Sequence, residues 1–128
     1  METQETNGAK GNKGYHKLLV WQEARELVIL VYKHTEEFPR TEEFGLKSQI
    51  RRASVSVVLN VVEGYRRSTR KDYLHFLNTA DGSLSEIEAA LELSLDLRFI
   101  SNIEYSILEN KRGQLGYLLS QLIMSLKK

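Results

Sequence analysis

Four long stretches of the chain carry apolar residues at alternating separations of three and four, which is the spacing of one face of an α-helix. We expect helices over residues 18–37, 43–63, 68–95 and 103–126. The one proline, Pro39, lies between the first two stretches. Because proline interrupts helices, its absence elsewhere allows each stretch to be continuous. Four long helices with short connections predict an all-α protein, an up-down-up-down four-helix bundle.

The second stretch needs a closer reading, because residues 55–62 are rich in β-branched side chains that favour strands. No turn residue interrupts residues 46–63, and the helical period persists throughout, so we interpret the stretch as a helix. Its main apolar stripe comprises Leu46, Ile50, Ala53, Val57 and Val61. Four further aliphatic residues lie outside that stripe: Val55, Val58, Leu59 and Val62. A helix that is apolar on several sides needs more neighbours than a small monomer supplies, which predicts self-association.

Local signals suggest where helices end and approach each other. Ser68 and Asn102 are candidate N-caps. Gly82 lies inside the third helix, and an interior glycine suggests the close approach of a neighbouring helix. Two glycines, Gly113 and Gly116, weaken the middle of the fourth helix.

With 128 residues the chain is long enough for one domain. We expect residues 1–16 to be a flexible polar tail and residues 17–128 to form the bundle. No apolar run approaches the ~18–20 residues that span a bilayer, and the first residues lack the apolar stretch of a signal peptide. The expected location is therefore the cytoplasm, without a membrane partner.

The net charge of +1 conceals a strong segregation of charges. Residues 47–71 hold seven basic residues and one acid, whereas residues 81–109 hold seven acids and one base. Such asymmetry suggests an anionic partner, or subunits that meet through opposite charges. The alternative is two ordinary solvated faces.

The basic segment supplies the candidate nucleic-acid contacts: Lys47, Arg51, Arg66, Arg67, Arg70 and Lys71. Arginine suits phosphate because its planar fork donates two parallel hydrogen bonds. Tyr65 and Tyr73 flank the cluster and could stack on bases, or form half-buried edges of the core. The alternative for the cluster is a turn that only keeps the protein soluble.

A polar stripe also runs along the second helix. Its members are Gln49, Arg52, Ser56, Asn60 and Glu63, at separations of three and four. Neighbours at this spacing can form hydrogen bonds, Ser56 with Asn60 and Asn60 with Glu63. A buried polar network typically fixes helix register or a subunit contact, and a nucleic-acid or ligand site is the alternative.

Features of catalysis are sparse. Cysteine is absent, which excludes thiolate nucleophiles and cysteine-based zinc sites. The three histidines, His16, His34 and His75, are scattered, and no phosphate-binding, dinucleotide-binding or zinc-protease motif occurs. We therefore expect a protein that is not an enzyme and that uses neither cofactor nor metal.

The sequence resembles a known family on a long central block. The matching residues are Phe38-Pro39, Phe44-Gly45-Leu46, Gln49 to Ala53, Ser56, Asn60, Glu63-Gly64, Phe76-Leu77, Ala80, Gly82-Ser83 and Glu86, with Val20-Trp21, Ala24 and Leu27 upstream. The chain looks like the bacterial four-helix-bundle proteins encoded in intervening sequences of 23S ribosomal RNA genes, to which the accessory variability determinants of diversity-generating retroelements are similar.

The resemblance implies a barrel-shaped homopentamer that binds nucleic acid without catalysis, and for the retroelement relatives a reverse-transcriptase partner. The competing hypothesis is a protein–protein adaptor, in which the basic block of one molecule meets an acidic stripe of another. That stripe comprises Asp81, Glu88, Glu92 and Asp96.

Overall fold

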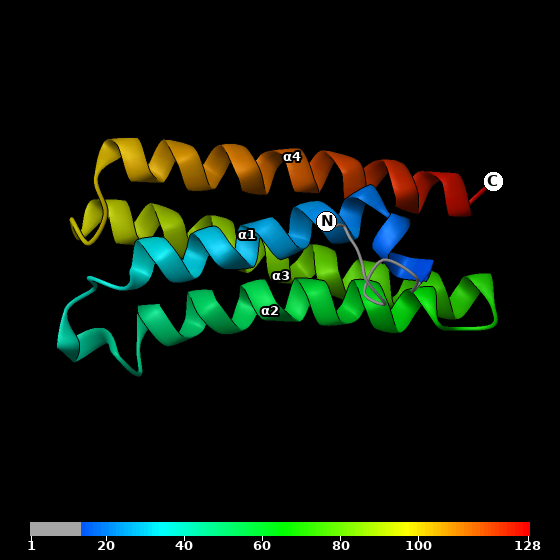
Figure 1. Cartoon of the computed structure of the whole chain (residues 1–128), viewed down its shortest axis with the longest axis horizontal. Coiled ribbons are helices and arrows are strands. Elements are labelled where there is room, and N and C mark those ends of the chain that lie inside the picture. Colours follow the sequence, from blue (N-terminus) through cyan, green and yellow to red (C-terminus); the bar gives the residue numbers. More distant parts are fainter. Residues whose placement is uncertain (1–13) are drawn as a thin grey trace.

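The structure is a computed structural model that describes residues 14–128. Its elements are a 3₁₀ turn η2 (Gly14–Lys17), α1 (Leu19–Thr35), a 3₁₀ turn η3 (Arg40–Glu42), α2 (Leu46–Tyr65), α3 (Arg70–Asp96) and α4 (Asn102–Leu126). Successive helices run in opposite directions along one axis (Figure 1). The described part of the chain contains no strand, so the predicted all-α four-helix bundle is confirmed.

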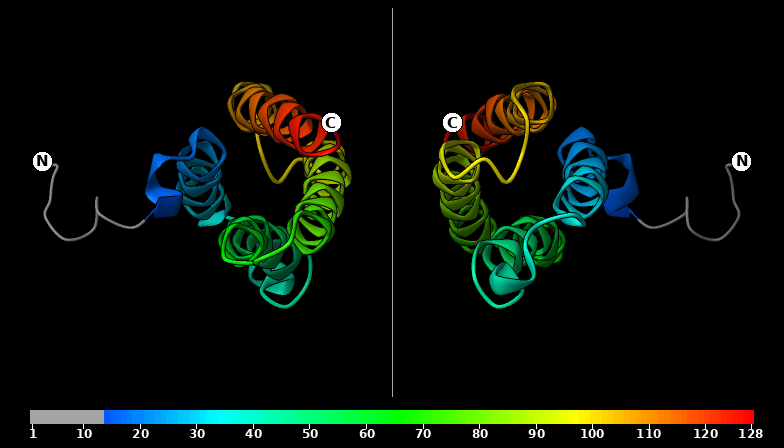
Figure 2. Two further views of the ribbon diagram at one scale, coloured as in Figure 1. Left: turned by 90° about the vertical axis from the view of Figure 1, so that its right-hand side faces the viewer. Right: turned by 90° about the vertical axis from the view of Figure 1, so that its left-hand side faces the viewer.

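The helices occupy the four corners of the bundle in chain order. Contacts join α1 to α2, α2 to α3, α3 to α4 and α4 back to α1. Viewed end-on, α1 and α3 therefore lie at opposite corners, and so do α2 and α4 (Figure 2). The outward sides of α2 and α4 consequently point away from each other.

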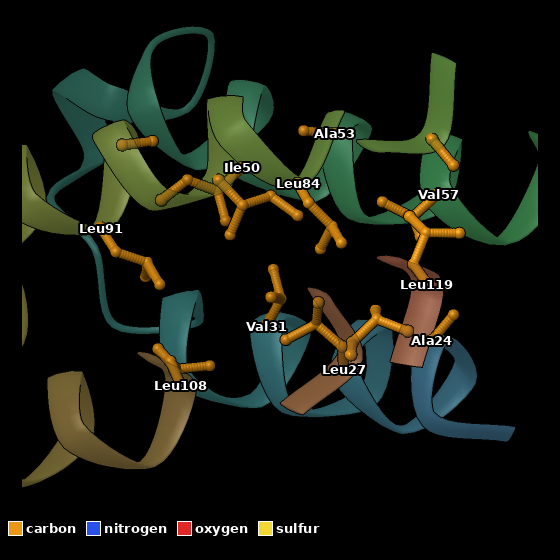
Figure 3. Close-up of a cluster of buried hydrophobic side chains, with 14 of the residues drawn as sticks. Ala24, Leu27, Val31, Ile50, Ala53, Val57, Leu84, Leu91, Leu108 and Leu119 are labelled. Carbon is orange, nitrogen blue, oxygen red and sulfur yellow. The ribbon is translucent and has the colours of Figure 1, made fainter. Parts of the chain in front are cut away.

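The core fills the space between the helices with aliphatic side chains (Figure 3). Ile50, Val57 and Val61 of α2 are fully buried, as the predicted stripe requires. They meet fully buried residues of the other helices, Leu27, Val31, Leu77, Ile87, Leu91, Leu108, Leu115 and Leu119. Burying a side chain of this size contributes about 1.5–3 kcal/mol, so this core is the main source of stability.

Helices α3 and α4 begin one residue away from their predicted caps. The N-cap of α3 is Thr69, whose hydroxyl accepts a hydrogen bond of 3.1 Å from the backbone N–H of Asp72. The N-cap of α4 is Ser101, which forms a reciprocal capping box with Glu104. The predicted caps Ser68 and Asn102 are thus wrong by one position, because each has a cap-forming neighbour that completes the better hydrogen bond.

The glycine that allows two helices to approach closely is not the predicted one. Gly82 faces solvent, and a Cβ built there would meet no atom within 4 Å, so the predicted close approach at Gly82 is wrong. The close approach occurs at Gly64, where a Cβ would lie 3.0 Å from Phe76 Cβ and 3.0 Å from Tyr73 Cδ1. Helix α4 continues unbroken through both of its glycines.

The start of the described chain packs against α1. The ring of Trp21 lies 5.4 Å from that of Tyr15 and 4.5 Å from that of His16, between centroids. Residues 14–16 of the predicted tail therefore belong to an ordered turn. The rest of the predicted tail, residues 1–13, lies outside the described residues.

Candidate nucleic-acid interface

Four of the predicted basic contacts gather at one end of the bundle, around the turn that joins α2 to α3. They are Arg66, Arg67, Arg70 and Lys71, and all four are exposed. The turn is tight because Gly64 lets the two helices approach and Thr69 starts α3 a few residues later. The backbone therefore concentrates these cations within about one turn of helix on either side.

The two arginines nearest the end of α2 are positioned by aromatic rings and one carboxylate. The guanidinium of Arg66 lies 5.3 Å above the ring centroid of Tyr15. The guanidinium of Arg67 lies 5.2 Å above the ring of Phe76 and forms an ion pair with Glu63, one turn earlier on α2. Cation–π contacts fix a guanidinium without neutralising it, so Arg66 keeps its full positive charge.

The end of α4 adds to this cluster in a way that the sequence does not reveal. Nη1 of Arg70 donates a 2.7 Å hydrogen bond to the backbone carbonyl of Lys128. This contact joins residues 58 positions apart and links the end of α4 to the start of α3, at the same end of the bundle as the α2–α3 turn (Figure 1). We call Arg66, Arg67, Arg70, Lys71, Lys127 and Lys128 the basic end.

Burial of the neighbouring aromatic residues differs. The pKa of Tyr73 is raised, first because the hydroxyl is partly buried and second because Tyr65 lies near it. The two rings meet edge to face with centroids 6.3 Å apart. Tyr73 therefore packs as an edge of the core, whereas Tyr65 remains 39% exposed at the rim of the basic end.

The other two predicted contacts lie far from the basic end. Arg51 precedes Arg66 by 15 residues, or about 22 Å along a helix. Its Nε donates to the hydroxyl of Thr35 at 2.8 Å, and its Nη2 donates to the carbonyl of Tyr32 and to Glu36, both at 3.1 Å. Arg51 therefore joins α2 to α1.

Lys47 forms an ion pair of 3.2 Å with Glu43, one turn before it. The structure thus separates the six predicted cations into a group of four and a distant pair.

The predicted polar stripe is only partly continuous. Ser56 Oγ lies 2.9 Å from Ser83 Oγ and so links α2 to α3. Nδ2 of Asn60 donates to the hydroxyl and to the carbonyl of Ser56, as predicted for this pair. Glu63 pairs with Arg67 instead of Asn60.

Its other two members, Gln49 and Arg52, are exposed. Their side chains form no hydrogen bond or ion pair within residues 14–128.

Helices α3 and α4 carry eight of the 17 acidic residues of the chain. Arg112 of α4 binds Glu109 at 2.6 Å and Glu88 of α3 at 3.3 Å. The hydrogen bonding that Arg112 donates to the Glu109 carboxylate is the largest cause of the raised pKa of Arg112. The remaining members of the acidic stripe, Asp81, Glu92 and Asp96, are exposed and form no ion pair with any described residue.

A second cation bridges α4 to α1. Nζ of Lys111 lies 2.7 Å from a carboxylate oxygen of Glu23 and 2.7 Å from one of Glu26. These hydrogen bonds, that to Glu23 first, raise the pKa of Lys111. Both cations of this helix are thus used within the fold.

Nowhere in residues 14–128 do three or more histidine, cysteine or acidic side chains group as a metal site would require. None of the helices in the same range is both long and apolar enough to cross a membrane.

These features define the class of protein: a small antiparallel four-helix bundle with six of its 18 basic residues gathered at one end. A family profile described as "23S rRNA-intervening sequence protein" matches residues 16–121. The chain therefore belongs to this family, and the family part of the sequence prediction is confirmed.

A solved structure has the same fold. It is the crystal structure of a protein of unknown function from the S23 ribosomal protein family of Bacteroides thetaiotaomicron VPI-5482. The two chains are 25% identical and superpose with a TM-score of 0.76, over 83% of this chain and 96% of that one. The comparison with curated proteins found no match.

Proposed function

We propose that the protein is a non-catalytic, oligomeric nucleic-acid-binding bundle of the cytoplasm, which contacts the phosphates of RNA or DNA with its basic end. The observation that carries the proposal is the hydrogen bond from Arg70 to Lys128, because it adds two lysines to the four cations of the α2–α3 turn. Within residues 14–128 the six exposed cations form one ion pair, that of Arg67 with Glu63. Such a cluster binds a nucleic acid because the counterions condensed on the nucleic acid are released when protein cations neutralise its phosphates.

The test is binding of labelled structured RNA and duplex DNA by fluorescence anisotropy at low salt. The variant Arg66→Gln/Lys71→Gln removes two cations of the basic end, neither of which forms an ion pair with a described residue. We expect at least a tenfold loss of affinity that is similar for all sequences, since phosphate contacts carry no base information.

The matched control is Arg40→Gln/Arg98→Gln. It removes the same charge from the connections at the opposite end of the bundle (Figure 1). We expect a much smaller loss for this control. Equal losses for both variants would mean that the net charge alone governs binding, and the assignment to the basic end would be wrong.

The oligomeric part of the proposal is supported by exposed aliphatic residues on α1 and α2. Leu59 is 60% exposed and Ile29 is 52% exposed, and Ile29 lines a hollow together with Val55 and Val58. Light scattering of the purified protein tests this part. We expect a multiple of the 14.8 kDa chain mass, with five copies as the resemblance implies, that persists in high salt because apolar burial is not screened.

The second candidate is a protein–protein adaptor, for which the resemblance to the accessory variability determinants implies a reverse transcriptase as partner. It is favoured by three exposed carboxylates on α3, those of Asp81, Glu92 and Asp96, which form no ion pair with any described residue. Failure to bind any nucleic acid at low salt would favour the adaptor. Co-elution of the protein with a purified reverse transcriptase would then support the adaptor, if charge reversal of Glu92 abolishes it.

A further inference from the structure

The outward face of α4 is a second apolar surface that the core does not use. The core face of this helix carries Leu108, Leu115 and Leu119, all fully buried. On the opposite side, residues separated alternately by four and three form a continuous seam that is free of charged side chains. This α4 seam comprises Ile103, Ile107, Asn110, Gln114, Tyr117, Gln121 and Met124.

Exposure along the α4 seam is high from one end to the other. Ile103 is 74% exposed, Tyr117 65% and Met124 58%. The spacing is that of a coiled-coil seam, in which apolar residues mix with a few amides that set the pairing. Charged residues make up 27% of the chain, so an outward stripe of this length without one indicates contact with another protein surface.

Small residues beside the α4 seam allow a helix to approach closely. Ser106, Gly113 and Ser120 are spaced seven residues apart on its flank. A Cβ at Gly113 would meet no atom within 4 Å, and the surface is hollowed there between Tyr117 and Leu19 of α1. Helix α4 therefore offers a groove in which a neighbouring helix can lie.

Helix α2 carries a seam of the same spacing on its own outward side. This α2 seam comprises Ser48, Arg52, Val55, Leu59 and Val62. Alongside it, α1 contributes Ile29 and Arg25, which line a shallow hollow with Val55. Arg25 and Arg52 form no ion pair with any described residue, so this apolar face is positively charged.

The two seams lie on helices at opposite corners of the bundle (Figure 2). The acidic face of α3 turns toward α4, because its Glu88 contacts Arg112 of α4 at 3.3 Å, and the same face carries the exposed carboxylates of Asp81, Glu92 and Asp96, which form no ion pair with any described residue. The side of the α2 seam carries Arg52 and, from α1, Arg25, which likewise form no ion pair with any described residue. Pairing α2 with α2 brings the arginines together, and pairing α4 with α4 brings the carboxylates together. Only a contact between unlike seams places opposite charges side by side.

We propose that the α2 seam of one subunit packs on the α4 seam of the next, so that copies of this chain associate head to tail. The inference rests on the oligomeric part of the proposed function and specifies its interface. Such a contact is heterologous: each subunit uses two different faces, and a closed ring forms if the rotation between subunits closes. The nucleic-acid part of the proposed function does not depend on it.

The test uses one charged substitution in each seam, Leu59→Glu and Tyr117→Glu, at side chains that the monomer leaves exposed. Each variant alone should lose the assembly and have the mass of a monomer in light scattering. An equimolar mixture of the two should form a dimer and nothing larger, because it retains one intact pair of seams. The control Leu93→Glu, at a residue 51% exposed on the outside of α3, should keep the wild-type mass.

Several results would overturn the head-to-tail interface. They are a wild-type mass for either seam variant, a mixture that stays monomeric, or a control that dissociates. Should a glutamate variant fail to fold by circular dichroism, the milder Leu59→Ser and Tyr117→Ser replace it with the same expected masses. A monomeric wild-type protein would instead refute the oligomeric part of the proposed function, and anisotropy would still report on nucleic-acid binding.

Discussion

Arg51 on α2 donates a 2.8 Å hydrogen bond from its Nε to the hydroxyl of Thr35, the last residue of α1. That hydroxyl is buried and donates in turn to the carbonyl of Val31 at 2.7 Å. The guanidinium also lies 4.4 Å above the ring of Tyr32. An arginine that the sequence presents as a phosphate contact is thus part of the packing between two helices.

This relationship predicts that Arg51→Ala destabilises the protein. The substitution leaves the Thr35 hydroxyl with one partner fewer and removes a charged hydrogen bond, which costs about 2 kcal/mol. Urea unfolding followed by circular dichroism measures the loss. The exposed Arg40→Ala should change stability by less than about 0.5 kcal/mol, and an equal effect of the two substitutions would contradict the account of Arg51.

Two glycines provide a matched test of helix packing. Gly64→Ala places a Cβ 3.0 Å from Phe76 Cβ and Tyr73 Cδ1, so these neighbours must shift by a few tenths of an ångström. Overpacking of this kind costs about 1–3 kcal/mol, which we expect to outweigh the gain of about 1 kcal/mol from replacing a helical glycine. Gly82→Ala adds a methyl group in open solvent and removes an interior helical glycine, which should stabilise the protein by about 1 kcal/mol. Thermal unfolding should therefore move the two melting temperatures in opposite directions. A loss of stability in Gly82→Ala would show that this residue is packed.

The capping box of α4 should make stability depend on pH. The pKa of Glu104 lies below its usual value of 4.5, first because the backbone N–H of Ser101 donates to the carboxylate and then because His34 does, at 3.1 Å. Because the folded pKa is lowered, the stabilisation is fully present above pH 4.5 and is lost as the pH falls through the lowered value.

The variant Glu104→Gln keeps an acceptor for Ser101 and removes the charge. It should therefore be less stable than the wild type at pH 7, with a difference that shrinks below pH 4.5. Urea unfolding at pH 7 and pH 3 measures this difference. A constant difference across that range would contradict the role of the ionised carboxylate, and Glu86→Gln on the exposed side of α3 serves as the control.

The sequence was sufficient for the fold, because each helix has a single long core stripe. Residues 46–61 of α2 show why: the spacing of Ile50, Val57 and Val61 outweighs the strand preference of valine, since burial favours the helix that presents them together. The predicted close approach of a helix at Gly82 is wrong. On a helical wheel Gly82 lies away from the core residues Leu84 and Ile87, so its position already points to solvent.

Other features depend on contacts between distant residues. The contact between Lys128 and Arg70 requires α3 and α4 to have nearly equal lengths, 27 and 25 residues, so that the end of α4 returns to the start of α3. The anchoring of Arg51 requires the last turn of α1 to end beside it. Local patterns carry neither fact. The α4 seam is different: its spacing is present in the sequence, but the core stripe on the other side of the same helix obscures it.

The most direct test of the central claim is the salt dependence of nucleic-acid affinity for the wild-type protein. If the six cations of the basic end contact phosphates, log Kd plotted against log salt concentration should have a slope of about 4 for single strands and about 5 for duplex DNA. The variant Arg66→Gln/Lys71→Gln should lower the slope by about 1.4–1.8. A slope near zero, or one that this variant leaves unchanged, would contradict phosphate binding by the basic end.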